Sequence, residues 1–333
     1  MSKGLKGLCH GLILLAALGL APQGALASGP LRIGFAQWPG FDVIWYGVAE
    51  RLFERRGVEV QFIRMDHQKD ATRALLRGRI DGAFTTLWDL YLAGDATDRV
   101  EVVLVANVSH GSDGLVAGPG LNAVSELRGK TVAARLGTVN QLILAEAMAL
   151  HGLGPGEIDV VDVSNDIAND RLLAGQVDAA VLWQPLLGEA AARSGGHVLF
   201  TTADVDSLVI DTLSISKSSA ANRNADWRRF MLAWLDIMQA IDEAPDAVFQ
   251  TVGEVLGQPA EEFARDYAGL IKGDAALNRR QFGPNGTIYS LYDRMERMVG
   301  LFPSYPIALN RDITFDGDLI LGAVEEWSTA NGS

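Results

Sequence analysis

Residues 31–62, LRIGFAQWPGFDVIWYGVAERLFERRGVEVQF, predict a strand, an aromatic loop, a helix and a second strand. Apolar residues alternate with polar or small ones over 31–36, which is the period of a strand, and a Pro-Gly pair then breaks the run. Over 43–53 the apolar residues recur at helical spacing, with charged residues on the other face. Asp42 is expected to be the N-cap of this helix, and Gly57 is expected to end it.

The order of strand, helix and strand makes the two strands parallel, so the first loop lies at the carboxyl edge of the sheet. Open α/β folds bind their ligands at that edge. We therefore expect Trp38, Phe41 and Asp42 in this loop, together with Trp45, to face a ligand-binding crevice.

The first 27 residues have the composition of a secretory signal peptide. Two lysines precede an apolar run over 11–20, and Ala25-Leu26-Ala27 is a small-residue cleavage site. We expect the chain to be exported and cleaved after Ala27. Cys9, the only cysteine, lies inside this segment, so neither a disulfide nor thiol chemistry is expected in the mature chain. No later stretch has the ~20 apolar residues that a transmembrane helix needs.

Length and charge limit the possible functions of the mature chain. Removal of 27 residues leaves 306, which is enough for two domains of ~100–200 residues each. These residues include 26 basic and 41 acidic side chains, a net charge of −15. Such a balance argues against binding to nucleic acid or to an anionic membrane. It does not restrict a small ligand, because the local charge of a site can oppose that of the whole chain.

A second unit repeats the order of the first. A helix and a short strand are predicted over 70–84, and the strand leads into the loop 85–91, TTLWDLY. This loop brings Thr86, Trp88 and Asp89 to the same edge of the sheet. It is therefore a second aromatic and acidic loop at the predicted crevice.

A new series of strands and helices begins further along the chain. A strand over 100–105 leads into the polar loop 107–114, NVSHGSDG, which contains Ser109 and Asp113. The alternation then starts again over 115–211, which predicts a second α/β domain.

After residue 215 the pattern becomes helical. A core-facing stripe has spacings of three and four and consists of Trp227, Phe230, Met231, Trp234, Met238 and Ile241. Further helices are predicted over 261–271 and 287–301, and an irregular segment over 302–315.

Several landmarks together resemble the periplasmic substrate-binding proteins of ABC importers, in the nitrate, sulfonate and taurine family and the related thiamine-pyrimidine binders. The landmarks are the signal peptide, the opening unit with FERRGVEV, the joint LRGKTV at 127–132, the helix start GTVNQ at 137–141, and Trp183-Gln184-Pro185 after a strand. The resemblance runs from about residue 31 to residue 215.

The resemblance implies a mixed α/β fold with two lobes, the type II periplasmic-binding-protein fold, in which the ligand lies in the cleft between lobes joined by two crossing segments. Lobe 1 would comprise residues 30–113 and 214–333, and lobe 2 residues 114–213. The hinges would lie at 107–114 and around 211–214.

The same resemblance implies a function. A monomer in the periplasm would capture a small polar organic solute and deliver it to a membrane-embedded ABC permease with its ATPase subunit. No cofactor, metal site or nucleic-acid partner is expected. Neither a nucleotide-binding loop nor paired histidines are present in the sequence.

The segment 137–141 is the expected anion site of the cleft. Backbone N–H groups and the helix dipole favour an anion at a helix start. Gly137, Thr138 and Asn140 begin the helix there, and the resemblance implies that this segment contacts the ligand.

Aromatic residues form the second expected part of the site. Trp38, Trp45, Trp88 and Trp183 each lie at or just past a predicted strand end. An aromatic face can hold a ligand cation or stack on a planar ring. The resemblance favours Trp38 and Trp183, and replacing either by alanine is expected to weaken binding without unfolding the chain.

Acidic residues make the ligand class an open question. Asp42, Asp89, Asp113 and Asp211 share these loops, which contain no basic residue except Arg135. A zwitterion such as taurine would place its sulfonate at the helix start and its ammonium against an aspartate and aromatic faces. A cationic or aminopyrimidine ligand would use only the second set. The residues expected at the ligand site are Trp38, Asp42, Trp45, Thr86, Trp88, Asp89, Ser109, Gly137, Thr138, Asn140, Trp183 and Asp211.

An enzyme on the same scaffold is a further alternative. Ser109, His110 and Asp113 bring a hydroxyl, an imidazole and a carboxylate together, but no G-x-S-x-G elbow surrounds them. A polar hinge loop explains these residues better, so no catalytic residue is assigned.

Overall fold

The computed structural model describes residues 29–94 and 99–331. The predicted signal peptide lies outside the described residues. Within them, every helix is too short or too polar to cross a bilayer.

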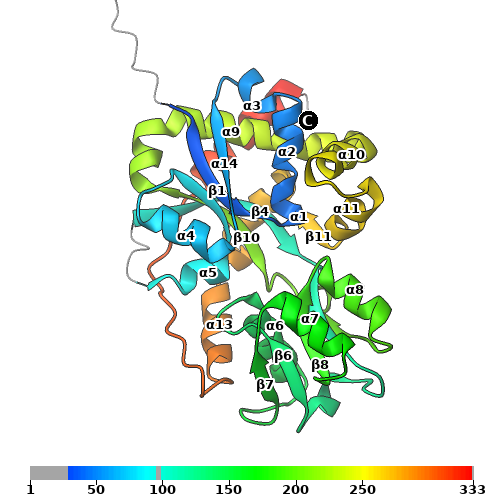
Figure 1. The fold of residues 1–333 in the computed structure, drawn as a ribbon. Helices are drawn as coiled ribbons and strands as arrows, with labels where there is room; N and C mark the ends of the chain where they lie inside the picture. The colour runs from blue at the N-terminus through cyan, green and yellow to red at the C-terminus, as the bar shows by residue number, and fades with distance from the viewer. Residues whose placement is uncertain (1–28, 95–98, 332–333) are drawn as a thin grey trace, which may run out of the picture.

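The chain forms two separate β-sheets, one in each half of the molecule (Figure 1). The first sheet has the strand order β11-β4-β10-β3-β1-β2, and β12 also pairs with β4. The second sheet has the order β7-β6-β8-β5-β9. The strands of the first sheet are β1 (Leu31–Ala36), β2 (Val60–Met65), β3 (Gly82–Thr86), β4 (Val100–Ser109), β10 (Ile210–Ser216), β11 (Leu270–Lys272) and β12 (Thr314–Phe315). Those of the second are β5 (Asp113–Ala117), β6 (Thr131–Ala134), β7 (Asp159–Asp162), β8 (Ala179–Trp183) and β9 (His197–Thr201).

Helices cover both sheets. Helices α4, α9, α12 and α14 pack on strands of the first sheet, and α6, α7 and α8 pack on strands of the second. The helices are α1 (Pro39–Asp42), α2 (Ile44–Ala49), α3 (Leu52–Arg55), α4 (Gln68–Leu76), α5 (Leu87–Tyr91), α6 (Val139–Leu150), α7 (Asn165–Leu173), α8 (Leu186–Arg193), α9 (Lys217–Glu243), α10 (Pro245–Leu256), α11 (Ala260–Tyr267), α12 (Ala275–Gln281), α13 (Leu291–Val299) and α14 (Asp318–Asn331). Short 3-10 turns are η2 (Val124–Leu127), η3 (Thr202–Asp204) and η4 (Thr287–Tyr289).

The opening unit has the predicted strands but not the predicted helix. β1 and β2 are parallel over their whole length, with Leu31 opposite Val60. The helix expected over 43–53 is divided into α2 and the start of α3, because the backbone at Arg51 enters the left-handed region with a φ of 55°. The prediction that Asp42 is an N-cap is also wrong, since it is the last residue of α1.

Three other boundaries differ from the prediction because local hydrogen bonds or long-range pairing decide them. The segment expected to be the loop 85–91 is mostly helix α5, since the hydroxyl of Thr86 accepts the N–H of Asp89 and caps its first turn. Helix α11 ends at Tyr267, and the chain then adds β11 to the edge of β4 instead of remaining helical to residue 271. The helix expected over 287–301 begins with η4, so α13 starts only at Leu291.

The core-facing stripe of α9 is confirmed. All six of its predicted residues are buried in the main hydrophobic core. The indole N–H of Trp234 donates to the carbonyl of Gly273, and that of Trp227 donates to the hydroxyl of Ser219. Both buried indole N–H groups therefore have a hydrogen-bond acceptor.

Two short segments of the chain, 110–112 and 205–209, link strands of one sheet to strands of the other. The residues 107–109 and 211–214, which were expected in the hinges, lie in β4 and β10. The hydroxyl of Thr202 ties the first link to the second half of the chain, since it accepts the N–H of Gly111.

Helix α13 connects the two halves again. It packs against α6, although it belongs to the C-terminal part of the chain (Figure 1). Arg294 of α13 pairs with Glu146 of α6 and donates to the carbonyl of Asp206 in the second link. After α13 the chain returns to the first sheet, where β12 pairs with β4.

Candidate ligand-binding site

Strands β3, β4 and β10 bring three polar residues to one edge of the first sheet. Asp211 at the start of β10 lies opposite Thr86 at the end of β3. On its other side it lies opposite Asn107 near the end of β4. This edge faces the links to the second sheet, so the register of β10 places the Asp211 carboxyl where the two halves meet.

Asp211 is the most unusual of these groups. Its residue is only 1% exposed, and neither carboxyl oxygen has a hydrogen-bond partner among the described residues. Burial raises the pKa of Asp211 well above its ordinary value, and the nearby Asp113 and Asp89 carboxyls raise it further. The neighbouring Trp38 and Asn107 side chains offset part of this rise. A buried carboxyl without a partner is costly unless a ligand supplies donors to it.

Trp38 and Asn107 form the wall next to Asp211. The indole N–H of Trp38 donates to Oδ1 of Asn107 at 3.3 Å, and Nδ2 of Asn107 has no partner among the described residues. Gly40 allows this packing, because a Cβ there would lie 2.1 Å from Nδ2 of Asn107. Asn107 is not among the site residues predicted from the sequence, although a polar residue at the end of an apolar strand is a usable signal.

Asp113 adds a second buried carboxyl. It begins β5 and pairs in the ladder with Trp183, the last residue of β8. Burial raises the pKa of Asp113 to about 7, and a hydrogen bond from Ser109 offsets part of the rise. Oδ2 of Asp113 has no hydrogen-bond partner in the described part of the chain. Trp183 is half-buried at the same strand end.

Ser109 has a structural role between the two links. Its hydroxyl lies 2.7 Å from that of Thr202, and its backbone N–H donates to the carbonyl of Val209. It thereby holds the end of β4 against the second crossing segment. These contacts, with the exposed position of His110, do not assemble a nucleophile and a base.

Asp42 is held by a hydrogen bond within its own loop, and Trp45 is held by packing against core residues. Oδ2 of Asp42 accepts the N–H of Trp38 at 3.0 Å. Burial raises the pKa of Asp42 to about 7, while hydrogen bonds from Trp38 and Trp45 and the charge of Arg64 lower it. The ring of Trp45 packs edge-on against Phe35 and Phe62. Asp42 therefore shapes the turn that presents Trp38.

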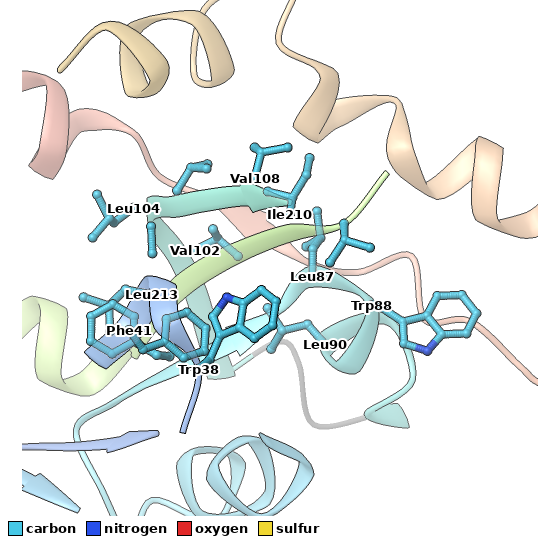
Figure 2. Close-up of a cluster of buried hydrophobic side chains, with 14 of the residues drawn as sticks. Trp38, Phe41, Leu87, Trp88, Leu90, Val102, Leu104, Val108, Ile210 and Leu213 are labelled. Carbon is cyan, nitrogen blue, oxygen red and sulfur yellow. The ribbon is translucent and has the colours of Figure 1, made fainter. Parts of the chain in front are cut away.

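Thr86, Asp89 and Trp88 lie at the start of α5. The hydroxyl of Thr86 donates to Oδ2 of Asp89 at 2.9 Å, and burial raises the pKa of Asp89 to about 6. Trp88 is buried, and Figure 2 shows its ring pointing away from Trp38. Its indole N–H has no partner among the described residues. Trp38 and Trp88 therefore do not form two walls of one aromatic box.

The start of α6 provides the site's edge on the second sheet. Thr138 is the N-cap, and its hydroxyl accepts the N–H of Asn140 at 3.3 Å. Asn140 donates to the carbonyl of Val181 in β8, whereas its Oδ1 has no partner in the described residues. The N–H of Gly137 donates to Oε1 of Gln141, whose Nε2 also lacks a partner there.

Two surface cavities of the described residues lie away from these groups. One has a volume of about 420 Å³ and lies between α2, α3 and α9, where Tyr46, Arg56 and Asp236 line it. The other, of about 320 Å³, lies between the second link and α13, where Ser207 and Arg294 line it. Neither cavity is lined by a predicted site residue.

Sequence comparisons identify relatives of known type. A family model described as NMT1/THI5 like matches residues 39–248. A binding protein of Brucella abortus (strain 2308) is 25% identical over 189 residues, which cover 56% of this chain and 58% of that protein. The chain thus spans a little over half the length of this relative. The taurine-binding periplasmic protein of Escherichia coli K12 is 23% identical over 230 residues, which cover 68% of this chain and 71% of that protein.

Solved structures confirm the predicted architecture. The periplasmic aliphatic sulphonate binding protein SsuA from Escherichia coli matches with a TM-score of 0.70 at 17% identity, over 84% of this chain and 94% of that chain. A Candida albicans protein described as having the generic periplasmic binding protein structural fold matches with a TM-score of 0.58. The mixed α/β architecture with two sheets is therefore that of the periplasmic binding proteins. Since the family model matches more than half of the sequence, the chain belongs to the NMT1/THI5-like family.

Proposed function

We propose that this protein is the solute-binding component of an ABC importer and binds a small zwitterion, with an ammonium group and an oxyanion, between its two halves. The family, the fold and the similarity to a taurine-binding periplasmic protein support this class of function. Its partners would be the ligand and a membrane permease with its ATPase subunit. Closing the two halves around the ligand would exclude water and strengthen each polar contact.

The observation that carries the ligand class is the buried Asp211 carboxyl, whose two oxygens have no hydrogen-bond partner among the described residues. Within the same residues Oδ2 of Asp113 also has no partner, and no basic residue is among the groups that affect the pKa of Asp211. These carboxyl oxygens favour a ligand that supplies N–H donors and a positive charge. Nitrate or a simple alkanesulfonate would instead place an anion beside two carboxyls, which is unfavourable.

The direct test is calorimetric titration of the purified mature chain with matched ligands. Taurine and β-alanine represent zwitterions, ethanesulfonate represents the anion alone, and ethanolamine represents the ammonium alone. We expect the zwitterions to bind at least tenfold more tightly than either of the single-charge ligands. Tighter binding of ethanesulfonate than of taurine would contradict the proposal.

A cationic or aminopyrimidine ligand is the second candidate, because the Asp211 wall would suit it without any anion site. Trp38 and the half-buried Trp183 could stack on a planar ring. Including 4-amino-5-hydroxymethyl-2-methylpyrimidine and choline in the titration separates the two candidates. Binding of these compounds with no binding of taurine would favour this second class.

The aromatic walls give a prediction about affinity and stability. Trp183→Ala should weaken ligand binding about 10-fold, since one aromatic face over a cation is worth ~1–2 kcal/mol when desolvated. Trp38 is also a core residue at 6% exposure, so Trp38→Ala should lower the melting temperature as well. Trp38→Phe is the companion variant, because it keeps an aromatic ring and removes the N–H that donates to Asn107, so it should retain most of the affinity that Trp38→Ala loses. Calorimetry and thermal melts check these variants, and unchanged affinity in both Trp183→Ala and Trp38→Ala would refute the aromatic wall.

The raised pKa values predict that affinity for an ammonium ligand increases about 10-fold from pH 5 to pH 8. The pKa of Asp113 is raised to about 7 and that of Asp211 well above its ordinary value, while an ammonium binds their ionised forms. The groups that affect the pKa of Asp211 are the Asp113 and Asp89 carboxyls, which raise it, and the Trp38 and Asn107 side chains, which lower it. Binding should therefore release protons, which titrations in buffers of different ionisation enthalpy measure. An affinity independent of pH would contradict this.

The ligand-free protein should show the opposite dependence. These carboxyls keep protons in the folded state that the unfolded chain, with an aspartate pKa of ~3.9, has already lost. Their contribution to the free energy of unfolding therefore falls as the pH rises from about 4 through about 7.

A further inference from the structure

Gly137, at the start of α6, is covered by two polar side chains from other parts of the chain. A Cβ at Gly137 would lie 2.9 Å from the hydroxyl of Tyr305 and 3.2 Å from Nζ of Lys69. Lys69 belongs to the first turn of α4, which packs on the first sheet. Tyr305 belongs to the segment between α13 and β12. The start of α6 thus lies next to an ammonium group from the N-terminal part of the chain and a hydroxyl group from its C-terminal part.

Lys69 is a cation without an ion pair in the described part of the chain. It is half-buried, and among the described residues no carboxylate oxygen lies within 4.0 Å of its Nζ. Burial lowers the pKa of Lys69, the charges of Arg135 and Arg73 lower it further, and those of Asp89 and Asp162 raise it. Lys69 therefore lies between Asp89, which follows β3 of the first sheet, and the start of α6. A partly desolvated ammonium in this position favours an anion beside it.

Tyr305 is held over Gly137 by its own segment. Its ring packs against the main core, and its N–H donates to the carbonyl of Phe302. Further along, the N–H of Asn310 donates to the carbonyl of Tyr91 in α5 at 2.7 Å. These bonds fix the segment at both sides of Tyr305. Among the described residues its hydroxyl makes no hydrogen bond, and it lies next to Gly137.

Gln141 gives an independent sign of a ligand at the same place. Its Oε1 accepts the N–H of Gly137 at 2.7 Å, so the amide group lies at the helix start. The residue is 1% exposed, and its Nε2 has no partner among the described residues. A buried donor without an acceptor is expensive, and an oxyanion is the group that would satisfy it.

We propose that Lys69, Tyr305 and Gln141 form an anion clamp around the start of α6, and that Lys69 determines the preference for ligands with an oxyanion. This clamp rests on the proposed function, and it specifies where each charged end of the zwitterion would lie. The ammonium would lie at Asp211 and Asp113, and the oxyanion would lie between Lys69 and Gly137. Arg135 contributes positive charge nearby but is exposed and paired with Asp162 at 3.5 Å.

The test measures how Lys69→Met changes the affinity for two ligands, taurine and ethanolamine, which share an ammonium group but of which only taurine carries an anion. We expect Lys69→Met to weaken taurine binding by about 10- to 100-fold and to change ethanolamine binding by less than twofold. Tyr305→Phe should weaken taurine binding about 3- to 10-fold, and Lys69→Arg should restore part of the affinity that Lys69→Met loses. Lys217→Met is the matched control, because Lys217 is exposed and follows the opposite end of β10.

Inorganic sulfate separates failure of the clamp from failure of the proposed ligand class. At constant ionic strength, sulfate should raise the melting temperature of the wild-type chain and of Lys217→Met, but not that of Lys69→Met. If the wild type binds taurine and Lys69→Met binds it equally well, the clamp is wrong and the proposed function stands. If the wild type binds no zwitterion, the proposed ligand class fails, and sulfate protection lost in Lys69→Met would still support the clamp. Absence of sulfate protection in that case would overturn both.

Discussion

Asp211→Asn should weaken the binding of an ammonium ligand about 100-fold while making the ligand-free protein more stable at pH 8. The loss follows because removing one partner of a buried, hydrogen-bonded charge pair costs ~2–5 kcal/mol of binding energy. The gain follows because the amide carries no charge beside Asp113 and Asp89, and at pH 8 the wild-type carboxyl is costly to ionise in its buried position. Few substitutions at a structural residue would move these two quantities in opposite directions.

Asp170→Asn is the control, because it makes the same replacement of aspartate by asparagine away from the proposed site. Asp170 is exposed on α7, so neither affinity nor melting temperature should change measurably. Calorimetry gives the affinities, and thermal melts at pH 5 and pH 8 give the stabilities, with the smaller difference between variant and wild type expected at pH 5. If Asp211→Asn kept wild-type affinity, or if it lost affinity and stability together, Asp211 would not be the ammonium site.

The local parts of this fold could be predicted from the sequence because they depend on nearest-neighbour patterns. The parallel pair β1 and β2, the core face of α9 and the cap of α6 each follow from the spacing of a few residues. The loops after parallel strands lie at one sheet edge for the same reason, and the Trp38 indole contacts Asn107 near the end of β4.

The site itself depends on long-range geometry that spacing does not contain. Asp211 meets Asn107 only because β10 pairs with β4 antiparallel in one particular register. Lys69 looks like any charged residue on an amphipathic helix, and only the folded chain brings its Nζ next to Gly137. The division of the first helix at Arg51 likewise follows from how Leu52 and Phe53 enter the core. The sequence therefore predicted which loops share one sheet edge, but it did not indicate that Asn107 and Lys69 lie near them.

The clamp also depends on how α13 is fixed to the second half of the molecule. In the chain, Tyr305 follows α13 by only a few residues, and α13 is fixed to α6 by Arg294. Nη2 of Arg294 lies 2.7 Å from Oε1 of Glu146, Nε lies 3.2 Å from Oε2, and Nη1 donates to the carbonyl of Asp206 at 2.7 Å. Arg294 therefore joins α13, α6 and the second link at one point.

Arg294→Met should lower the free energy of unfolding by about 2–3 kcal/mol, because it leaves the nearly buried Glu146 carboxylate without its partner. Denaturant unfolding measures this change. The double variant Arg294→Met/Glu146→Gln should recover much of the loss, since no unpaired charge is then buried. Arg297→Met, one turn further along the same helix and exposed, should change stability by less than about 0.5 kcal/mol.

The same variant connects stability with ligand recognition. If α13 holds Tyr305 over Gly137, loosening α13 should weaken taurine binding more than ethanolamine binding, which is also the result expected for Tyr305→Phe. Proteolysis between residues 300 and 313 should also become faster, because the segment loses its anchor at one end. Equal loss for both ligands, with unchanged proteolysis, would show that Arg294 acts only on the stability of the fold. A selective loss of taurine binding would show that the C-terminal segment is part of the site, because the anion would then be recognised by a contact that exists only when α13 is docked on α6.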